Sequence, residues 1–417
     1  MVSTSLESLF VDDLALIGRN LTSIQYLIRI CNHQFQLNGL QININKSKIL
    51  TKDEALKEAQ NRFSRTLTQF ETQEVYRYLG VVMNLKKGSS LAFLNQRKNI
   101  VSRFKSFKGQ LLILAKESFD FIAVGADLFT SLALASTLYG IEVISVTKNI
   151  CQQLDSIQAE FAAKLLKVNT TCAHAGLLKE MGWAPVSMII AKRKLKYWNR
   201  LQNLPQESWA SKAFHDCLSA NSPSEGAWHS KYRDELQKIH DKWGIPFNTG
   251  NNESWKTVEK ALEESFHKNI AAKLKEHREH SLKYLPEYPI SKYRQGYING
   301  SKEASVLTKF RLGHANLGNR DDPKILICPS CGKGPNNELH LAFECEAMSE
   351  LRQETEMKAI YDEARDQLRY TNNDPRKLKS FLGNDFASDK TLLRRGNFLS
   401  KLRQKHLENL EAALTDD

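Results

Sequence analysis

The feature that most restricts the fold of this sequence is a group of four potential metal ligands near its C-terminal end. Three cysteines and one histidine follow the spacing C-x2-C-x8-H-x4-C: Cys328, Cys331, His340 and Cys345. Three thiolates and one imidazole complete a tetrahedral zinc shell, and a cysteine pair two residues apart forms a turn that grips one side of the ion. The alternative is three free thiols with an incidental histidine. Because three of the seven cysteines cluster here, the segment favours a small zinc module with Zn2+ as cofactor.

The other cysteines and the N-terminus indicate the compartment. The remaining cysteines are scattered and the total of seven is odd, which does not fit a disulfide framework. The sequence does not begin with a basic segment followed by an apolar core, and its most apolar stretch, 121–146, is interrupted by Asp127 and Glu142. We therefore expect an intracellular protein, nuclear or cytoplasmic, with no membrane partner.

The charge of the chain bears on its partner. The 417 residues include 59 lysines and arginines against 47 acidic residues, for a net charge of +12. This excess favours a polyanion such as nucleic acid as the partner. The alternative is a basic, soluble surface with no polyanion behind it. The hydrophobic fraction of 41% is enough for packed cores, which excludes an intrinsically disordered chain.

A second motif lies near the N-terminus, where Phe10-Val11-Asp12-Asp13-Leu14 is flanked by apolar residues. Adjacent carboxylates at a tight turn between two strands are suited to Mg2+, which prefers carboxylate oxygens. Two-metal nucleotidyl transfer uses two such ions, about 3.5–4 Å apart, to activate a hydroxyl and to stabilise the leaving pyrophosphate. The pair alone is weak evidence, because two other Asp-Asp pairs in the sequence lack strand-like flanks.

Two further patterns follow along the chain. They are Gly-Leu-x-x-Asn-x-x-Lys-Ser at residues 39–47 and Tyr-x-Tyr-Leu-Gly at residues 76–80. Apolar residues at helical spacing predict a helix that precedes the first of them, and alternating apolar residues predict strands at 41–50 and 75–83. Taken alone, Lys46 is a surface lysine after a strand, and the second pattern closes an ordinary strand in a glycine.

In this order and at these distances the three motifs resemble the second half of the palm of a reverse transcriptase, most closely that of the LINE-type (non-LTR) retrotransposon polyproteins. The resemblance implies that Asp12 is a Mg2+ ligand and Asp13 its less essential neighbour. It implies that Lys46 helps to protonate the departing pyrophosphate. The implied activity is RNA-directed DNA synthesis on an RNA template and a DNA primer. The primer grip, which holds the primer end against the metal ions, corresponds to Tyr78, Leu79 and Gly80.

A palm of this kind also needs a metal-binding aspartate on an upstream strand, and the sequence before Phe10 is too short to supply one. We therefore expect the isolated chain, as the C-terminal part of a LINE-type reverse transcriptase, to be inactive as a polymerase. The alternative is a non-enzymatic protein that binds RNA or DNA through its basic helices and zinc element.

Such polymerases place a helical thumb after the primer grip, and residues 91–204 carry helical patterns with two basic clusters. Lysines and arginines on these helices would contact phosphates without sequence preference. The aromatic residues between them are expected in the core rather than stacked on bases. The expected nucleic-acid-binding residues are Arg97, Lys98, Arg103, Lys105, Lys192, Arg193, Lys194 and Lys196.

The zinc pattern resembles the Cys-Cys-His-Cys element near the C-terminus of LINE-type proteins, and residues 309–314 resemble the segment leading into it. His314 is a spare candidate ligand that we do not expect to be used. Between Lys268 and Arg320 eleven basic residues stand against four acidic ones, so the approach to the element is basic.

Together these patterns predict an α+β fold that is mostly helical, with a partial polymerase palm (β-hairpin, helix and strands), thumb-like helices and a small zinc module. The predicted segments are 1–90 (palm), 91–204 (helical, thumb-like), 205–254 (linker-rich), 255–320 (basic helical), 321–350 (zinc element) and 351–417 (charged C-terminal helices).

Overall fold

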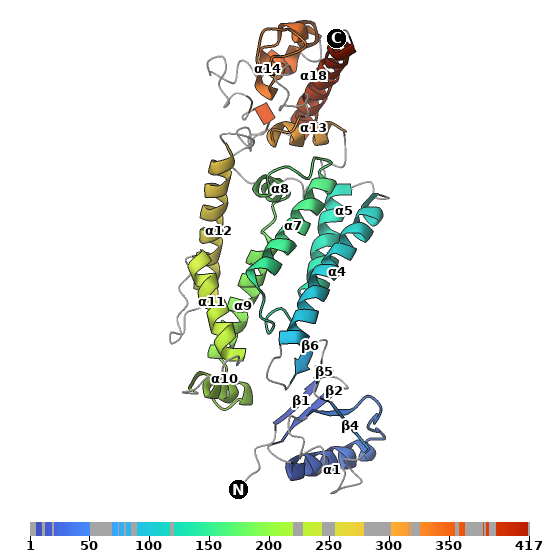
Figure 1. Ribbon diagram of the computed structural model, residues 1–417, viewed down its shortest axis with the longest axis vertical. Helices are drawn as coiled ribbons and strands as arrows, with labels where there is room; N and C mark the ends of the chain where they lie inside the picture. Colours follow the sequence, from blue (N-terminus) through green and yellow to red (C-terminus); the bar gives the residue numbers. More distant parts are fainter. Residues whose placement is uncertain are drawn as a thin grey trace.

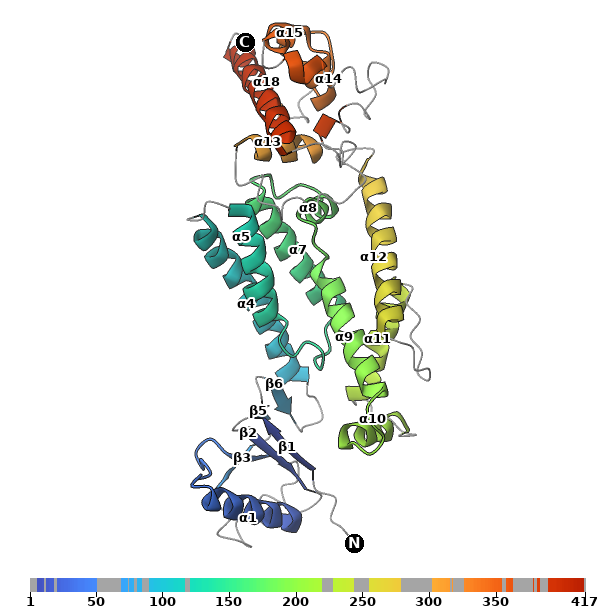
Figure 2. The ribbon, with the colours of Figure 1, turned by 180° about the vertical axis from the view of Figure 1, so that it is seen from behind.

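The computed structural model has an elongated shape (Figure 1). The strands and α1 lie at one end, a body of long helices lies in the middle, and a C-terminal module lies at the other end (Figures 1 and 2). The chain is mostly helical with small sheets, as the sequence predicted. The residues described are 6–10, 13–18, 21–50, 69–73, 75–78, 81–84, 90–116, 121–219, 228–243, 255–278, 302–315, 317, 326–354, 358–362, 378, 381–382 and 389–415.

The N-terminal end begins with the predicted hairpin. Strands β1 (Leu6–Phe10) and β2 (Asp13–Ile17) pair antiparallel, with Phe10 opposite Asp13. The predicted helix follows as α1 (Leu21–Leu37), in which Leu27 and Ile28 are buried. Ile28 and Phe70 form a small core with partly buried apolar residues of the strands and loops around them. The hairpin and the helix are therefore confirmed.

The strands after α1 differ from the prediction. The expected strand over 41–50 is wrong for its first part: β3 (Lys48–Leu50) is short, and a turn precedes it. The side chain of Asn43 accepts a hydrogen bond from the Lys46 backbone N–H at 3.2 Å, and this local bond competes with strand pairing. The expected single strand over 75–83 is two antiparallel strands, β5 (Val75–Tyr78) and β6 (Val81–Asn84).

Within the described residues the strands form separate two-stranded sheets. The pairs are β1 with β2, β5 with β6, and β3 in parallel with β4 (Glu71–Gln73). One continuous sheet, as a polymerase palm would have, is not seen in these residues, and the palm remains a hypothesis.

The helical body is built around a stack of aromatic rings. The rings of Phe129, Phe161 and Trp183 are nearly parallel and mutually in contact, with centroid distances of 5.0, 4.7 and 6.2 Å, and Phe104 packs tilted against Phe129 at 5.3 Å. Of the aromatic residues between the basic clusters, Phe104 and Trp198 are buried as expected, whereas Phe107 and Tyr197 are half-buried. Most of this core is supplied by α4 (Ser90–Lys116), α5 (Phe121–Leu128), the π-helix η1 (Phe129–Leu134), α7 (Lys148–Leu165), α8 (His174–Met181) and α9 (Val186–Gln202). The short helix α6 (Ala135–Thr137) continues η1.

The segment 205–254, which the sequence predicts to be rich in linker, contains two helices. They are α10 (Trp209–Ser219) and α11 (Trp228–Trp243), and both pack on α9 together with α12 (Trp255–Arg278). Tyr232 and Leu236, one helical turn apart, are buried against Trp198 of α9. Turn-forming residues in 203–208, 220–227 and 244–254 dominate the composition of the segment and obscure its helical apolar spacing.

The C-terminal module consists of α13 (Lys302–Arg311), α14 (Glu338–Phe343), the 3-10 helix η4 (Glu346–Met348), α15 (Ser349–Gln353) and α18 (Asp389–Thr415). Helices α13 and α18 cross closely at Gly396, where an added Cβ would lie 2.6 Å from the Glu303 carbonyl oxygen. A glycine at this crossing therefore permits the two backbones to touch. None of the described helices combines the length and apolar character needed to cross a bilayer.

A buried ion pair joins this module to the helical body. Arg311 at the end of α13 donates from Nη1 to Glu180 Oε2 of α8 at 3.1 Å, and from Nε to the Leu382 carbonyl oxygen at 3.0 Å. The side chains of Arg311 and Glu180 are 1% and 0% exposed, so each charge depends on the other for compensation.

Replacing Arg311 by methionine should lower the free energy of unfolding by about 3–5 kcal/mol, because the Glu180 carboxylate would remain buried without its cation. Urea denaturation of the wild type and the variant measures this loss. The double variant Arg311→Met/Glu180→Leu, which removes both charges, should regain most of it. If the double variant loses as much free energy of unfolding as Arg311→Met, or more, the two charges do not depend on each other.

Candidate metal centre

The four predicted ligands of the C-terminal module converge. Their ligand atoms all lie within 4.8 Å of one another. The Sγ atoms of Cys328 and Cys345 are 3.7 Å apart, and Cys331 Sγ lies 3.2 Å from His340 Nε2. Two tetrahedral sulfur ligands about 2.3 Å from a zinc ion are separated by about 3.8 Å, so the Cys328–Cys345 spacing suits such an ion, while the sulfur–nitrogen pair is slightly closer than the roughly 3.5 Å of a tetrahedral site. The predicted ligand set is thus assembled as one group that could hold a metal ion such as zinc.

The first cysteine pair is shaped by backbone hydrogen bonds. The N–H groups of Cys331 and Gly332 both donate to the Cys328 carbonyl oxygen, at 3.3 and 2.8 Å, which closes the turn between the two thiols. Gly332 has φ 67°, a left-handed conformation that glycine adopts without strain. The Cys328 N–H donates in turn to the Gly334 carbonyl oxygen at 2.7 Å, so the chain folds back beneath the turn.

His340 is oriented by both its backbone and its ring. It lies in the first turn of α14, and the Asn337 side chain caps this helix by accepting from the His340 N–H at 2.9 Å. The ring lies against Gly334, where an added Cβ would be 2.1 Å from His340 Cε1. Nε2 faces the thiols, while Nδ1 lies 3.7 Å from Glu344 Oε2. The Glu344 carboxylate therefore lies on the side of the ring away from the thiols, near the nitrogen that would not bind the ion, but beyond hydrogen-bond distance.

The fourth ligand lies just after α14. The Cys345 N–H donates to the His340 carbonyl oxygen at 2.8 Å, which ties the last two ligands together. The Cys345 carbonyl oxygen accepts from the buried Arg352 guanidinium. The position of Cys345 is therefore held from both sides of its peptide unit.

A hydrogen bond couples the two buried thiols. The hydrogen bond from Cys345 lowers the pKa of Cys328. The same bond, together with burial, raises the pKa of Cys345. Thiol ligands bind zinc as thiolates, so metal binding would release protons from the cysteines. Four protein ligands with no open position form a structural centre rather than a catalytic one.

A second layer of contacts reaches the C-terminal helix. Ser330, between the first two cysteines, lies with Oγ 2.9 Å from His406 Nδ1 on α18. The other ring nitrogen of His406 lies 3.3 Å from the Leu317 carbonyl oxygen, which can only accept a hydrogen bond. His406 Nε2 is therefore the donor and Ser330 donates to Nδ1. This fully buried histidine couples the cysteine turn to α18.

Sequence reasoning found the four ligands but missed their supports. Glu344 is readable in hindsight, because it lies four residues after His340 on a helical stretch, where side chains meet. No local sequence pattern could have predicted the contact between His406 and Ser330, because the two residues are 76 positions apart. His314 is outside the ligand group found among the described residues, in line with the expectation that it is not used.

No protein family, no curated protein and no solved structure matches this chain.

The residues expected at the polymerase-like end are only partly described. Asp13 is exposed at the start of β2, Lys46 is exposed in the turn before β3, and Tyr78 is half-buried in β5. The Tyr76 hydroxyl donates to the Lys46 carbonyl oxygen at 3.3 Å, which brings the second and third motifs side by side. Three of the expected site residues lie outside the described residues: Asp12, Leu79 and Gly80.

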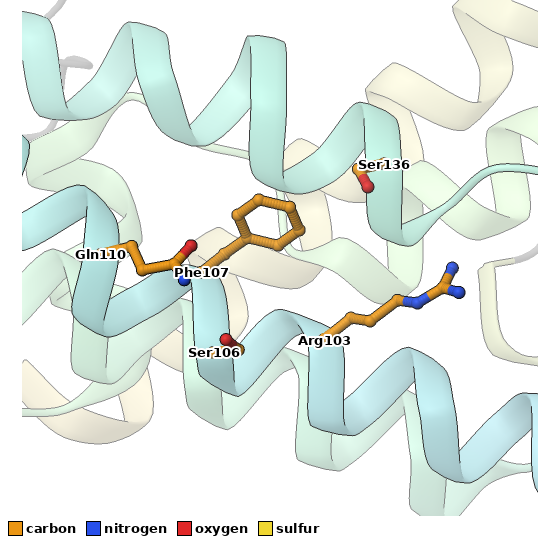
Figure 3. Close-up of a pocket in the computed structure, with 5 residues that line it drawn as sticks. All are labelled: Arg103, Ser106, Phe107, Gln110 and Ser136. Carbon is orange, nitrogen blue, oxygen red and sulfur yellow. The ribbon is translucent and has the colours of Figure 1, made fainter.

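Of the first basic cluster, Arg103 and Lys105 are exposed on α4, whereas nothing is described of the side chains of Arg97 and Lys98. Arg103 borders a shallow groove between α4 and α6, with Phe107 at its centre (Figure 3). The other lining side chains are polar and uncharged: Ser106, Gln110 and Ser136.

The second basic cluster, on α9, is largely used within the protein. Lys192 pairs with Glu259 and Glu263 of α12, at 2.6 and 3.3 Å. Arg193 donates to the Leu138 carbonyl oxygen at 3.0 Å. Lys196 is exposed. Most of the cationic groups of this cluster therefore hold helices together.

The assignment of Lys194 to nucleic-acid binding is wrong. Its side chain is 0% exposed, and Nζ donates to the Ile144 carbonyl oxygen and lies 3.3 Å from Glu235 of α11. Burial lowers the pKa of Lys194, and the Glu235 carboxylate opposes that shift. A lysine enclosed in this way cannot reach a phosphate. Lys194 lies on the face of α9 that also carries buried Ile190, Ala191 and Trp198, and these apolar residues turn that face toward the core.

Replacing Gly334 by alanine should reduce zinc affinity at least tenfold, because the new methyl group would displace the His340 ring from the ligand group. Competition with a chromophoric chelator measures the affinity. Gly109→Ala is the matched control, since an added Cβ there meets nothing within 4 Å. Equal zinc affinity in the Gly334 variant and the control would mean that the ring is not a ligand.

Proposed function

We propose that this chain is a zinc-containing nucleic-acid-binding protein that shares its descent with LINE-type reverse transcriptases. The single observation that carries the proposal is the assembled group of three thiols and one imidazole in the C-terminal module. The centre has no open position for a substrate, so its contribution is to the shape of a binding module.

Zinc fits the group better than the other common protein metals. Three thiolates are soft ligands, which disfavour Mg2+ and Ca2+, and the ligand spacing suits a tetrahedral ion. When bound, zinc would cross-link the cysteine turn to α14 and the residue that follows it. Cys328, Cys331, His340 and Cys345 would hold it.

Nucleic acid as the partner is supported by charge. The chain carries a net charge of +12, and exposed cations are present on two helices of the body. Arg103 and Lys105 on α4, and Lys196 on α9, are not ion-paired with any acidic residue that the structure describes. Such cations contact phosphates without reading sequence, so affinity should depend strongly on salt.

The descent is supported by order and spacing. The Asp-Asp motif, the Gly-Leu-x-x-Asn-x-x-Lys-Ser motif and the Tyr-x-Tyr-Leu-Gly motif follow one another in the order of a reverse transcriptase palm, and the zinc pattern lies near the C-terminus. By this resemblance the natural partners are an RNA template and a DNA primer or target.

The test is binding of a labelled single-stranded RNA and its DNA counterpart, each about 20 nucleotides long, at several salt concentrations. The purified chain should contain one zinc ion and should bind both strands, with affinity falling as salt rises. Cys328→Ser should lose the metal and weaken binding, because the module is built around the ion. Cys31→Ser, a change on α1 far from the centre, is the control. A zinc-loaded wild type that holds neither strand would refute the proposal.

A second candidate function is RNA-directed DNA synthesis, and one observation favours it. In the β1–β2 hairpin Phe10 lies opposite Asp13, so Asp13 of the Asp-Asp motif begins the second strand. Against it, no group of three or more carboxylates suited to Mg2+ is found among the residues that the structure describes.

We expect no primer extension by the isolated chain with Mg2+, because two adjacent carboxylates do not complete a two-metal site. The assay compares the wild type with Asp12→Ala and an enzyme-free blank on a primed poly(A) template. Synthesis by the wild type that is lost in Asp12→Ala would overturn this expectation and establish a polymerase.

A further inference from the structure

A buried arginine lies behind the metal centre. Arg352, on α15, is 6% exposed, and its Nη2 donates to the carbonyl oxygen of the last ligand, Cys345. Its Cζ atom lies 5.7 Å from the centre of the Tyr361 ring. The Tyr361 hydroxyl donates in turn to the Phe343 carbonyl oxygen at 3.4 Å. The guanidinium is therefore enclosed between a metal ligand and an aromatic ring that is tied to the end of α14.

Both of these partners are uncharged. No carboxylate of the described residues lies within ion-pair distance of Arg352, and its buried Nη1 atom makes no hydrogen bond there. Of its acidic neighbours in the sequence, Glu350 is exposed and Glu354 pairs with Lys401 of α18 at 3.1 Å. An arginine side chain stays protonated in a folded protein, and a buried charge without a partner is strongly destabilising. Arg352 therefore needs a negative charge that no neighbouring carboxylate provides.

The metal centre supplies that charge when it is loaded. A divalent ion held by three thiolates and a neutral imidazole leaves one negative charge in excess. Cys328 and Cys345 are 1% and 0% exposed, so water screens this charge poorly. Cys345 belongs to the ligand group and also provides the carbonyl oxygen that Arg352 contacts. The atoms of a single residue thus separate the guanidinium from the negatively charged centre.

We propose that Arg352 is the counter-ion of the metal centre, whose positive charge balances a zinc ion held by three thiolates. The inference rests on the metal centre of the proposed function and deepens it, because it names the residue that allows three thiolates to be buried together. Opposite unit charges within about 10 Å, at an effective dielectric constant of about 20, change an affinity by about tenfold or more. The arginine should therefore be a measurable part of zinc binding, although it is not a ligand.

The test compares the zinc affinity of variants of the full chain by competition with a chromophoric chelator. Arg352→Met removes the charge and keeps an apolar stem, and it should bind zinc at least about tenfold more weakly than the wild type. Arg352→Lys keeps the charge and should remain within about threefold of the wild type. A lysine variant as weak as the methionine variant would overturn the proposal, because the shape of the guanidinium would then matter rather than its charge.

Lys333→Met is the matched control. Lys333 lies two residues after Cys331, but its side chain is 73% exposed and pairs with Glu346 at 2.8 Å. Water screens such a charge, so its removal should change zinc affinity less than about twofold. If Lys333→Met loses as much affinity as Arg352→Met, the centre responds to any nearby cation and Arg352 is not its counter-ion.

A second measurement separates the charge of Arg352 from its packing. Thermal denaturation of each variant is followed with the metal removed and again at a fixed concentration of free zinc. Zinc should raise the melting temperature of the wild type and of Arg352→Lys by similar amounts, and that of Arg352→Met by clearly less. If Arg352→Met instead lowers the melting temperature of both forms and leaves the rise caused by zinc unchanged, Arg352 has only a packing role and the proposal is wrong.

The outcomes separate this proposal from the proposed function. If the wild type binds no zinc, both fail. If the wild type binds zinc and Arg352→Met binds it equally well, the proposed function stands and Arg352 is not the counter-ion of its metal centre.

Discussion

The arrangement of this molecule depends on the buried ion pair between Arg311 and Glu180. Both side chains are buried, so neither charge can be left without the other. The pair ties α13 to α8, and α13 in turn packs along α18 at the Gly396 crossing. Together with Leu312 in the core of the helical body, it anchors the module that carries the metal centre.

Many of the contacts that shape the metal centre are made by residues other than its four ligands. The four side chains alone specify a metal, but the surrounding chain selects their geometry through the cap at Asn337, the ring contact at Gly334 and the hydrogen bond between Ser330 and His406. These contacts orient the thiols and the imidazole toward one another, as residues around a metal site do when they fix the direction of its ligands.

What the sequence predicted correctly depends on local signals. The β1–β2 hairpin follows from apolar residues on both sides of a polar turn, α1 follows from helical spacing, and the zinc ligands follow from a fixed separation along the chain. Predictions failed where a tertiary contact decides. Lys194 belongs to a basic cluster in the sequence, yet Glu235, 41 residues later, makes a buried position possible. The prediction of a strand over 41–50 failed for a different reason: the Asn43 side chain accepts a hydrogen bond from the local backbone, and only the short β3 forms.

The residues at the end of α13 decide where this protein can be divided. Leu312 follows Arg311 and is buried in the core of the helical body, while Val306, Leu307 and Phe310 of the same helix belong to the core of the C-terminal module. A fragment cut before α13 would retain every zinc ligand but would expose Leu312 to water and leave the Arg311 guanidinium facing solvent. A fragment cut after α13 would leave the module core open. Helix α13 and the residue that follows it therefore belong to both hydrophobic cores, so a cut on either side of the helix disrupts one of the two cores.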